Sequence, residues 1–200
     1  LIEDCGEEAS QSLSKLGGYG FNTAIFDLIG DNSAAVKALI SEAQAAGIYS
    51  GVRADISGGD TVTAFLEEVN ADFVILSGAD ETLGDYVSKV TAVCEKITAI
   101  DSAAEIGVEP VYCSNISSGL DELISGGSID FVFVVQSGND DSAFSIFENA
   151  QTIWNEKAIS VWMCHCLKGL DSFSTEKAKK TVSSVSRSAD MSMCGALAFY

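Results

Sequence analysis

The sequence predicts an α/β fold, a (β/α)8 barrel of the TIM type with seven clear strands and a first strand that is missing or very short. Strand-length apolar runs alternate with longer stretches of helical apolar spacing, the pattern of βα units around a parallel sheet. A helix precedes the first recognisable strand and a bare strand ends the chain, so a strand before Leu1 is expected. The stretch "GGYGFN" precedes a strand, whereas the phosphate loop of a doubly wound sheet follows one, which favours the barrel.

Each expected strand is an apolar run bounded by Gly, Asp or Ser. The single proline, Pro110, is placed at the start of the fourth run, where a missing N–H is tolerated. The runs span 22–29, 49–56, 72–78, 109–115, 130–137, 159–165 and 194–200.

The stretches between the strands have the apolar period of helices, with start and stop signals at their ends. Ser33 begins one helix and Gly47 stops it, and Ser174 begins another. No low-complexity linker and no repeat of about 20 to 50 residues divides the chain, so one domain over residues 1–200 is expected. The expected helices span 6–16, 32–46, 60–69, 82–100, 117–125, 142–156 and 174–188.

The composition is strongly acidic, with 11 Lys and Arg against 29 Asp and Glu and a net charge of −18. Such a field repels phosphate backbones and anionic lipid headgroups. The longest apolar runs, such as "FVFVVQ" and "GALAFY", are far shorter than the roughly 20 residues of a membrane helix. We therefore expect no nucleic-acid partner and no membrane insertion. The start at Leu1, without Met or a signal peptide, leads us to expect a processed or excised domain.

The six cysteines are expected to be mostly free, buried thiols, because a chain of this length needs no disulfide framework and contains no CxxC pair. Cys164 and Cys166 share a strand face but lie farther apart than the Cα separation of about 5.5 Å that a disulfide requires. The cysteines stand at positions 5, 94, 113, 164, 166 and 194.

Functional residues of α/β barrels gather at the carboxyl ends of the strands, because the loops there converge on one pocket. In this chain those ends carry acids, amides, a guanidinium and an aromatic ring, a set that suits a sugar. The residues at these ends are Asp27, Asp31, Arg53, Asp55, Asp80, Glu81, Ser114, Asn115, Gln136, Asn139, Asp140, His165, Lys168 and Tyr200.

Glycoside hydrolysis needs two carboxyl groups roughly 5 to 10 Å apart. The candidate catalytic acids are Asp27, Asp55 and Asp80. Asp80, like Asp31 and Asp140, stands in a turn-like stretch and has the alternative role of a cap or turn former. Arg53 and Asp55 share one strand face, where they either pair across the pocket or satisfy one another in the barrel interior.

The only histidine lies in Cys164-His165-Cys166, on an expected strand. Neighbours on a strand point to opposite faces, so the three side chains do not converge on one metal and no Cys–His nucleophilic pair forms. If His165 faces the barrel mouth, both cysteines face the helices. His165 is then a pocket hydrogen bonder, with a satisfied core histidine as the alternative. We expect no metal and no cofactor.

Several stretches together resemble the glycosyl-hydrolase-like (β/α)8 barrels of bacterial envelope lipoproteins, relatives of family-10-type glycosidases. They are "GYGFNTAIFDLIGD", "AAGIYSGVRADI", "LISGGSIDFVFVVQS", "WMCHCLKG" and "GALAFY". In this resemblance Cys164-His165-Cys166 looks like the family's Gly-His-Ala site and Gln136 looks like the Gln of its Pro-Gln-Ile-Tyr strand end. Phe199 and Tyr200 look like its terminal aromatics. The resemblance implies a secreted or cell-envelope location.

The sequence departs from that family where the acids stand. A His-Phe-Asp-Asp-Tyr run is replaced by residues 75–79, "ILSGA", so both acids are gone unless Asp80 and Glu81 take their place. The leading hypothesis is a glycoside-hydrolase-like barrel that acts on or binds a polysaccharide or cell-wall glycan. The alternatives are a non-catalytic carbohydrate-binding or scaffold domain of a larger surface protein, and a cytoplasmic enzyme. The expected substrate-binding residues are Arg53, Asn115, Gln136, His165 and Tyr200.

Overall fold

The structure is a computed structural model that describes residues 22–78, 83–109, 116–136, 159–166 and 194–198, with the single positions Leu13, Gly18 and Glu156. Seven strands form one parallel sheet in the order of the chain. They are β1 (Thr23–Leu28), β2 (Tyr49–Asp55), β3 (Phe73–Ser77), β4 (Glu105–Glu109), β5 (Phe131–Gln136), β6 (Ser160–Cys166) and β7 (Cys194–Ala198).

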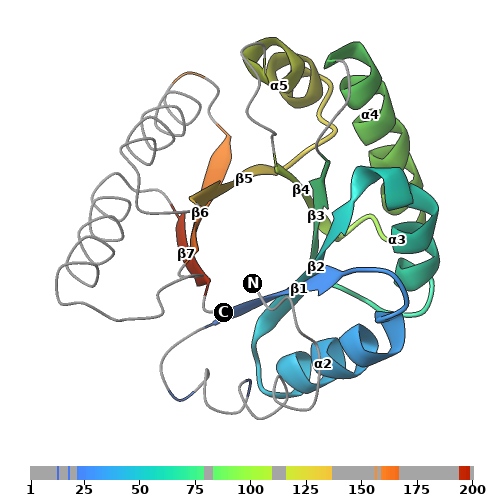
Figure 1. The fold of residues 1–200 in the computed structure, drawn as a ribbon, viewed down its shortest axis with the longest axis vertical. Helices are drawn as coiled ribbons and strands as arrows, with labels where there is room; N and C mark the ends of the chain where they lie inside the picture. Colours follow the sequence, from blue (N-terminus) through green and yellow to red (C-terminus); the bar gives the residue numbers. More distant parts are fainter. Residues whose placement is uncertain are drawn as a thin grey trace, which may run out of the picture.

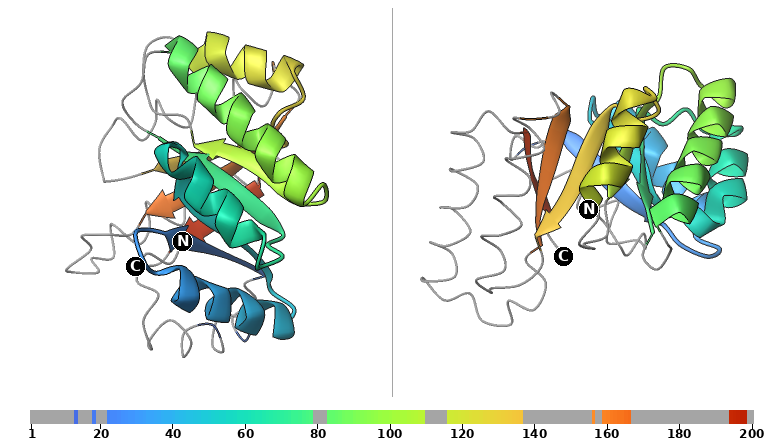
Figure 2. Two further views of the ribbon diagram at one scale, coloured as in Figure 1. Left: turned by 90° about the vertical axis from the view of Figure 1, so that its right-hand side faces the viewer. Right: turned by 90° about the horizontal axis from the view of Figure 1, so that it is seen from above.

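The strands lie in an arc around a common centre, and the helices cover the outer side of that arc (Figure 1). Figure 2 shows α3, α4 and α5 side by side over the outer face of the strands. The helices are α2 (Ser33–Ala45), α3 (Gly59–Leu66), α4 (Leu83–Ile100) and α5 (Ile116–Ser125), with a single 3-10 turn, η1 (Ile56–Gly58), before α3. The predicted α/β fold with a parallel sheet is confirmed for the described residues.

The predicted fourth strand, 109–115, is wrong. The structure places β4 at Glu105–Glu109, where Glu105 pairs with Phe73 and Glu109 pairs with Ser77. Ile106 and Val108 are buried against the helices, but the alternate positions are two glutamates and a glycine, so the run does not have the apolar character of a strand. The placement of Pro110 at a strand start is therefore also wrong, because β4 ends one residue before it.

The other described elements begin and end within about three residues of their predicted bounds, close to the usual disagreement between assignments. Three predicted helices, 6–16, 142–156 and 174–188, lie outside the described residues, apart from Leu13 and Glu156, which are helical. No described helix is long and apolar enough to cross a membrane.

Two glycines with positive φ end the helices that lead into β2 and β5. Gly47 has a φ of 73° and Gly127 a φ of 65°, a conformation that glycine adopts without a Cβ clash. After α2, the Ile48 amide donates to the carbonyl of Ala43, and after α5 the Ser128 amide donates to that of Leu123. The predicted stop at Gly47 is confirmed.

The strands bury two different faces, because successive side chains alternate between them. One face packs against the helices and forms the larger apolar core, with Phe26, Val52, Val74 and Val108 fully buried in it. The other face points to the centre of the arc. Its buried residues are Ile25, Phe73, Ile75, Phe131, Phe133 and Cys164, with Tyr49, Val135 and Trp162 packed against them.

Aromatic rings fill the inner face near the amino ends of the strands. Trp162 stacks on Phe131 with centroids 4.1 Å apart and meets Phe73 edge-on at 5.2 Å, and Tyr49 stacks on Phe73 at 5.2 Å. Gly51 and Gly107 make the space for these rings. A Cβ on Gly51 would lie 2.5 Å from a ring carbon of Phe73, and one on Gly107 would lie 2.2 Å from a ring carbon of Phe131.

Cys164 belongs to this inner face and is fully buried. The sequence tied a position of His165 at the barrel mouth to cysteines that face the helices. Cys164 does not meet that condition, because it packs on the inner face. Cys94 and Cys164 are buried and form no disulfide, as expected. The other four cysteines lie outside the side chains that the structure describes.

Candidate functional site

Polar side chains from four neighbouring strands meet at the carboxyl edge of the sheet. Register pairs Asp27 of β1 with Arg53 of β2, and Ser77 of β3 with both Asp55 of β2 and Glu109 of β4. Each of these residues is among the last three of its strand, on the carboxyl side of the aromatic layer of the inner face. This edge is where α/β folds place their ligands.

Arg53 lies between two carboxylates. Its Nη1 donates to both oxygens of Asp27, at 3.1 and 3.3 Å, and its Nε donates to Oε2 of Glu109 at 2.5 Å. The Asp27 side chain is only 2% exposed, against 18% for Glu109 and 25% for Arg53. Asp27 is thus a buried anchor, and the other two side chains reach toward solvent.

The charge of Arg53 is fixed by these neighbours. Burial lowers the pKa of the guanidinium, but the hydrogen bond and charge of Glu109, with Asp27 adding, outweigh it and raise the pKa above its already high ordinary value. Arg53 therefore stays protonated at every pH at which the protein is folded.

One end of the guanidinium remains open to a ligand. An arginine carries five N–H donors, two of them on each terminal nitrogen. Nε and Nη1 are used by Glu109 and Asp27, while Nη2 donates to none of the residues that the structure describes. Because Arg53 lines a cavity and is a quarter exposed, Nη2 offers two charged donors in an orientation set by the carboxylates.

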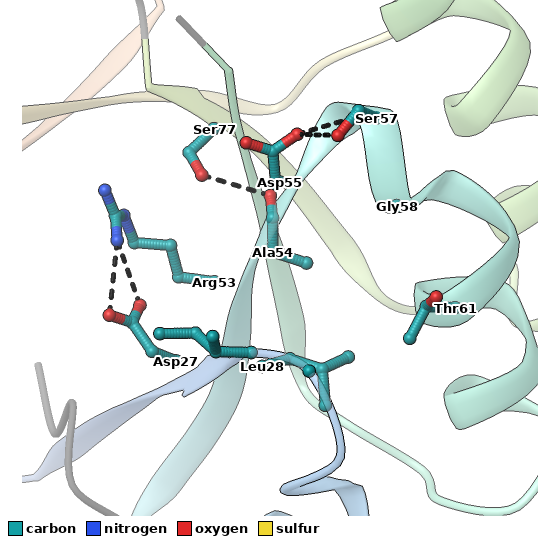
Figure 3. Close-up of a pocket in the computed structure, with 11 residues that line it drawn as sticks. Asp27, Leu28, Arg53, Ala54, Asp55, Ser57, Gly58, Thr61 and Ser77 are labelled. Carbon is teal, nitrogen blue, oxygen red and sulfur yellow. Dashed lines mark hydrogen bonds and ion pairs between the residues drawn. The ribbon is translucent and has the colours of Figure 1, made fainter.

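The cavity over this edge has a volume of about 410 Å³, within the range of small-molecule sites. Three charged residues, three hydroxyls and two apolar side chains line it (Figure 3), namely Asp27, Arg53, Asp55, Ser57, Thr61, Ser77, Leu28 and Ile29. Ile29 is 61% exposed, so one wall presents an apolar surface to solvent.

The loop after β1 is held in place by one side chain. Asn32 donates through Nδ2 to the carbonyl of Asp27 at 2.8 Å and accepts through Oδ1 from the amide of Ile29 at 3.0 Å. Gly30 takes a positive φ of 58° between them, which glycine tolerates. The apolar wall is therefore a defined part of the cavity.

Asp55 caps the turn that follows β2. Its Oδ1 accepts from the Ser57 amide at 2.7 Å and from the Ser57 hydroxyl at 2.5 Å, which caps η1. Figure 3 shows Asp55 turned toward Ser57 and away from Arg53. The predicted alternatives for Arg53 and Asp55, pairing across the pocket or satisfying one another, are both wrong, since Arg53 binds Asp27 and Glu109 instead.

Three of the predicted site residues line one cavity, namely Asp27, Arg53 and Asp55. Asp80, Asn115 and Tyr200 lie outside the described residues. Gln136 and His165 are register partners on β5 and β6, but their side chains are outside the described set.

Sequence reasoning missed Glu109, because it placed this residue at the start of a strand and not at the end. The signal that identifies it is the alternation of residues 105–109, "EIGVE", in which Ile106 and Val108 share the helix-facing side and Glu109 the other. Within the described part of the chain, no group of three or more His, Cys, Asp or Glu side chains is arranged to hold a metal ion.

No protein-family model matches the chain, and no curated protein matches it either. Solved structures match over most of the length. A catalytic domain of a mannanase from Streptomyces sp. SirexAA-E is 11% identical with a TM-score of 0.64, covering 96% of this chain and 70% of that one. A β-glucanase from Saccharophagus degradans is 12% identical with a TM-score of 0.62, covering 100% and 77%.

A third match is KGPDC from Streptococcus mutans, 14% identical with a TM-score of 0.66, covering 98% of this chain and 84% of that one. At such identities the likeness concerns the fold alone. The class defined by the fold and the polar carboxyl edge is therefore a parallel α/β chain of TIM-barrel type, with glycosidases among its structural neighbours.

Proposed function

We propose that this protein is a glycosidase-like barrel that binds a carbohydrate at the carboxyl edge of its sheet and does not cleave it. The observation that carries the proposal is the orientation of Arg53 by Asp27 and Glu109, which leaves Nη2 without a hydrogen bond to any described residue on a side chain that lines a cavity. A charged donor held in this way positions a ligand acceptor without having to be ordered when the ligand binds.

The cavity offers what a sugar ring needs. Carboxylate and hydroxyl oxygens of Asp55, Ser77 and Thr61 accept from or donate to sugar hydroxyls, and Arg53 donates to a hydroxyl or ring oxygen. The exposed side chain of Ile29 supplies apolar surface for the C–H face of the ring. Carbohydrate remains the proposed partner, and the net charge of −18 opposes nucleic acid.

Binding without hydrolysis is favoured because the described acids are already engaged. A glycosidase needs one carboxylic acid that carries a proton and a second, free carboxylate. Asp27 and Glu109 both accept from the guanidinium of Arg53, and Asp55 caps η1, so each of these three carboxylates already has a partner.

A hydrolase is the second candidate, and one spacing favours it. Since Asp27 and Glu109 bind nitrogens of the same guanidinium, their nearest oxygens are no more than about 8 Å apart, given the size of that group. This upper limit falls inside the range of roughly 5 to 10 Å found between glycosidase carboxyls, so the two acids are not too far apart for hydrolysis. In this candidate Glu109 takes the place of the acids that the sequence lacks at residues 75–79.

Three further parts of the proposal concern closure of the barrel, the location of the protein and the remaining site residues. The strand order and structural neighbours support closure of the sheet into an eight-stranded barrel by a further strand beside β1. The resemblance to the barrels of bacterial envelope lipoproteins supports a secreted or cell-surface location, and the missing acid run supports the alternative of a non-catalytic domain of a larger surface protein. Asp80, Gln136, His165 and Tyr200 remain proposed site residues from the sequence, whereas Asn115 loses the strand end that suggested it, because β4 ends at Glu109.

The test is binding of neutral oligosaccharides, measured by calorimetry with cellohexaose, mannohexaose, xylohexaose and laminarihexaose. We expect one or more to bind, and Arg53→Lys to weaken that binding about tenfold, because lysine keeps the charge but loses the oriented fork. Lys96→Arg, on the exposed face of α4, is the matched control and should bind normally.

Failure of every oligosaccharide to bind to the folded protein would overturn the proposal. Binding that Arg53→Lys leaves unchanged would overturn the location of the site. New reducing ends released from a bound oligosaccharide, and lost in Glu109→Gln, would establish the hydrolase in its place.

A further inference from the structure

The site carries more negative than positive charge even though a guanidinium lies at its centre. The carboxylates of Asp27, Glu109 and Asp55 lie at this edge of the sheet with one arginine, which leaves a formal charge of −2 on these described residues. Arginine in a binding site usually recognises an anion. A two-point contact with an anion uses Nη2 together with either Nε or Nη1, and here Nε and Nη1 are already engaged by Glu109 and Asp27.

We propose that the site selects saccharides by charge, accepting neutral sugars and rejecting uronic acids, and that Glu109 is the residue that sets this selectivity. This inference rests on the proposed carbohydrate binding. Glu109 is suited to the role because it binds Nε and is partly exposed, whereas Asp27, which binds Nη1, is almost fully buried.

The geometry gives the two partners of Arg53 separate tasks. Asp27 makes a two-oxygen contact with Nη1 and is almost fully buried, so it determines where the guanidinium lies. Glu109 makes a single contact, with Nε of Arg53, and is 18% exposed, so its charge acts on any ligand that binds Nη2. A neutral hydroxyl accepts from Nη2 without penalty, while a ligand carboxylate at the same place meets the repulsion of Glu109 and Asp55.

The experiment compares sugars that differ only in charge. Cellohexaose is paired with the β-1,4-glucuronan hexamer, and mannohexaose with the β-1,4-mannuronan hexamer, and dissociation constants are measured by calorimetry. At low salt, about 10 mM, the neutral member of whichever pair binds should bind at least about tenfold more tightly. At about 500 mM salt the preference should shrink severalfold, because the Debye length falls from about 30 Å to a few ångströms.

Glu109→Gln should reduce the neutral-to-acidic preference by about threefold to tenfold at low salt, while its amide oxygen still accepts from Nε of Arg53. Glu67→Gln, an exposed position just after α3 at the opposite end of the strands, changes the net charge equally and should leave the preference unchanged.

The outcomes separate the two proposals. If no saccharide of either kind binds, the proposed function has failed. If the neutral sugar binds but the uronan of the same linkage binds as tightly at low salt, the function stands and the charge selectivity is overturned. Equal effects of Glu109→Gln and Glu67→Gln would attribute the preference to the overall field of the protein and overturn the role of Glu109.

Discussion

Gly51 of β2 is the register partner of Phe73 on β3, and the ring of Phe73 occupies the space that a side chain at position 51 would need. A Cβ there would lie 2.2 Å from the carbonyl oxygen of Phe73 and 2.5 Å from its ring. The same relationship recurs two strands further on, between Gly107 of β4 and Phe131 of β5. Glycine on the even strand and phenylalanine on the odd strand thus allow bulky rings to fill the inner face.

Gly51→Ala is expected to destabilise the protein by about 1 to 3 kcal/mol, because overpacking forces the backbone or the ring of Phe73 to move. Urea unfolding followed by circular dichroism measures the change. Gly58→Ala is the control, since a Cβ at Gly58 approaches other atoms no closer than 4.0 Å. Equal stability of the two variants would mean that the ring of Phe73 can move to accommodate a Cβ at position 51 without loss of stability.

The relationship between Gly51 and Phe73 also explains what could be predicted from the sequence. The "DFV" runs at 72–74 and 130–132 have the apolar pattern of buried strands and were placed within a residue. Their partners, "SGVRAD" and "EIGVE", carry glycine and charged residues on the inner face. The first is still apolar enough to be recognised as a strand, and the second is not. The glycine on the inner face of β4 is explained only by its contact with the ring of Phe131, and this contact joins residues that lie far apart in the sequence.

The candidate site, like the strands, was predicted only in part from the sequence. Asp27 and Arg53 stand inside apolar runs, where a charge needs a partner, and both are at the site. Which residue pairs with which depends on strand register, so the sequence suggested Asp55 for Arg53 and overlooked Glu109. The sequence left the phase of β6 open for a related reason, since Val161 and Cys164 are both apolar and only their neighbours in the fold distinguish the two faces.

Asp27→Ala is expected to cost about 3 to 5 kcal/mol, because it removes one partner of a buried ion pair and leaves Arg53 with one carboxylate. Asp27→Asn, which keeps an oxygen near Nη1, should cost clearly less. Denaturant unfolding of both variants measures the difference. A loss below about 1 kcal/mol in Asp27→Ala would contradict the assignment of Asp27 as the anchor of Arg53.

Asp55→Ala is expected to destabilise the protein by about 0.5 to 2 kcal/mol through loss of the cap on η1. Asp55→Asn retains a side-chain oxygen for the Ser57 amide and should be close to the wild type. Thermal unfolding of the pair gives the comparison. If Asp55→Asn were as damaging as Asp55→Ala, the negative charge itself and not the cap would be the important property.

Cys94 is expected to resist alkylation in the folded protein. Burial, with the charge of Asp130 adding, raises the pKa of its thiol to about 12, and the thiolate is the reactive form. Iodoacetamide at pH 8, followed by peptide mass spectrometry, should leave Cys94 unmodified until denaturant is added. Rapid labelling of Cys94 without denaturant would show that α4 opens readily from the sheet.

Tyr49 is expected to make stability depend on pH in the alkaline range. Burial raises the pKa of its hydroxyl from 10.0 to about 12, and the carboxylates of Glu105, Asp72 and Asp130 near the amino ends of the strands add to the shift. Since the folded state holds the proton more tightly than the unfolded state, this contribution is complete below pH 10 and is lost as the pH rises from 10 toward 12. Urea unfolding between pH 8 and pH 12 should therefore show a decline that is smaller in Tyr49→Phe. Because other groups also titrate there, the decisive quantity is the difference between the two curves, and parallel curves would mean that Tyr49 ionises as freely in the folded protein as in the unfolded chain.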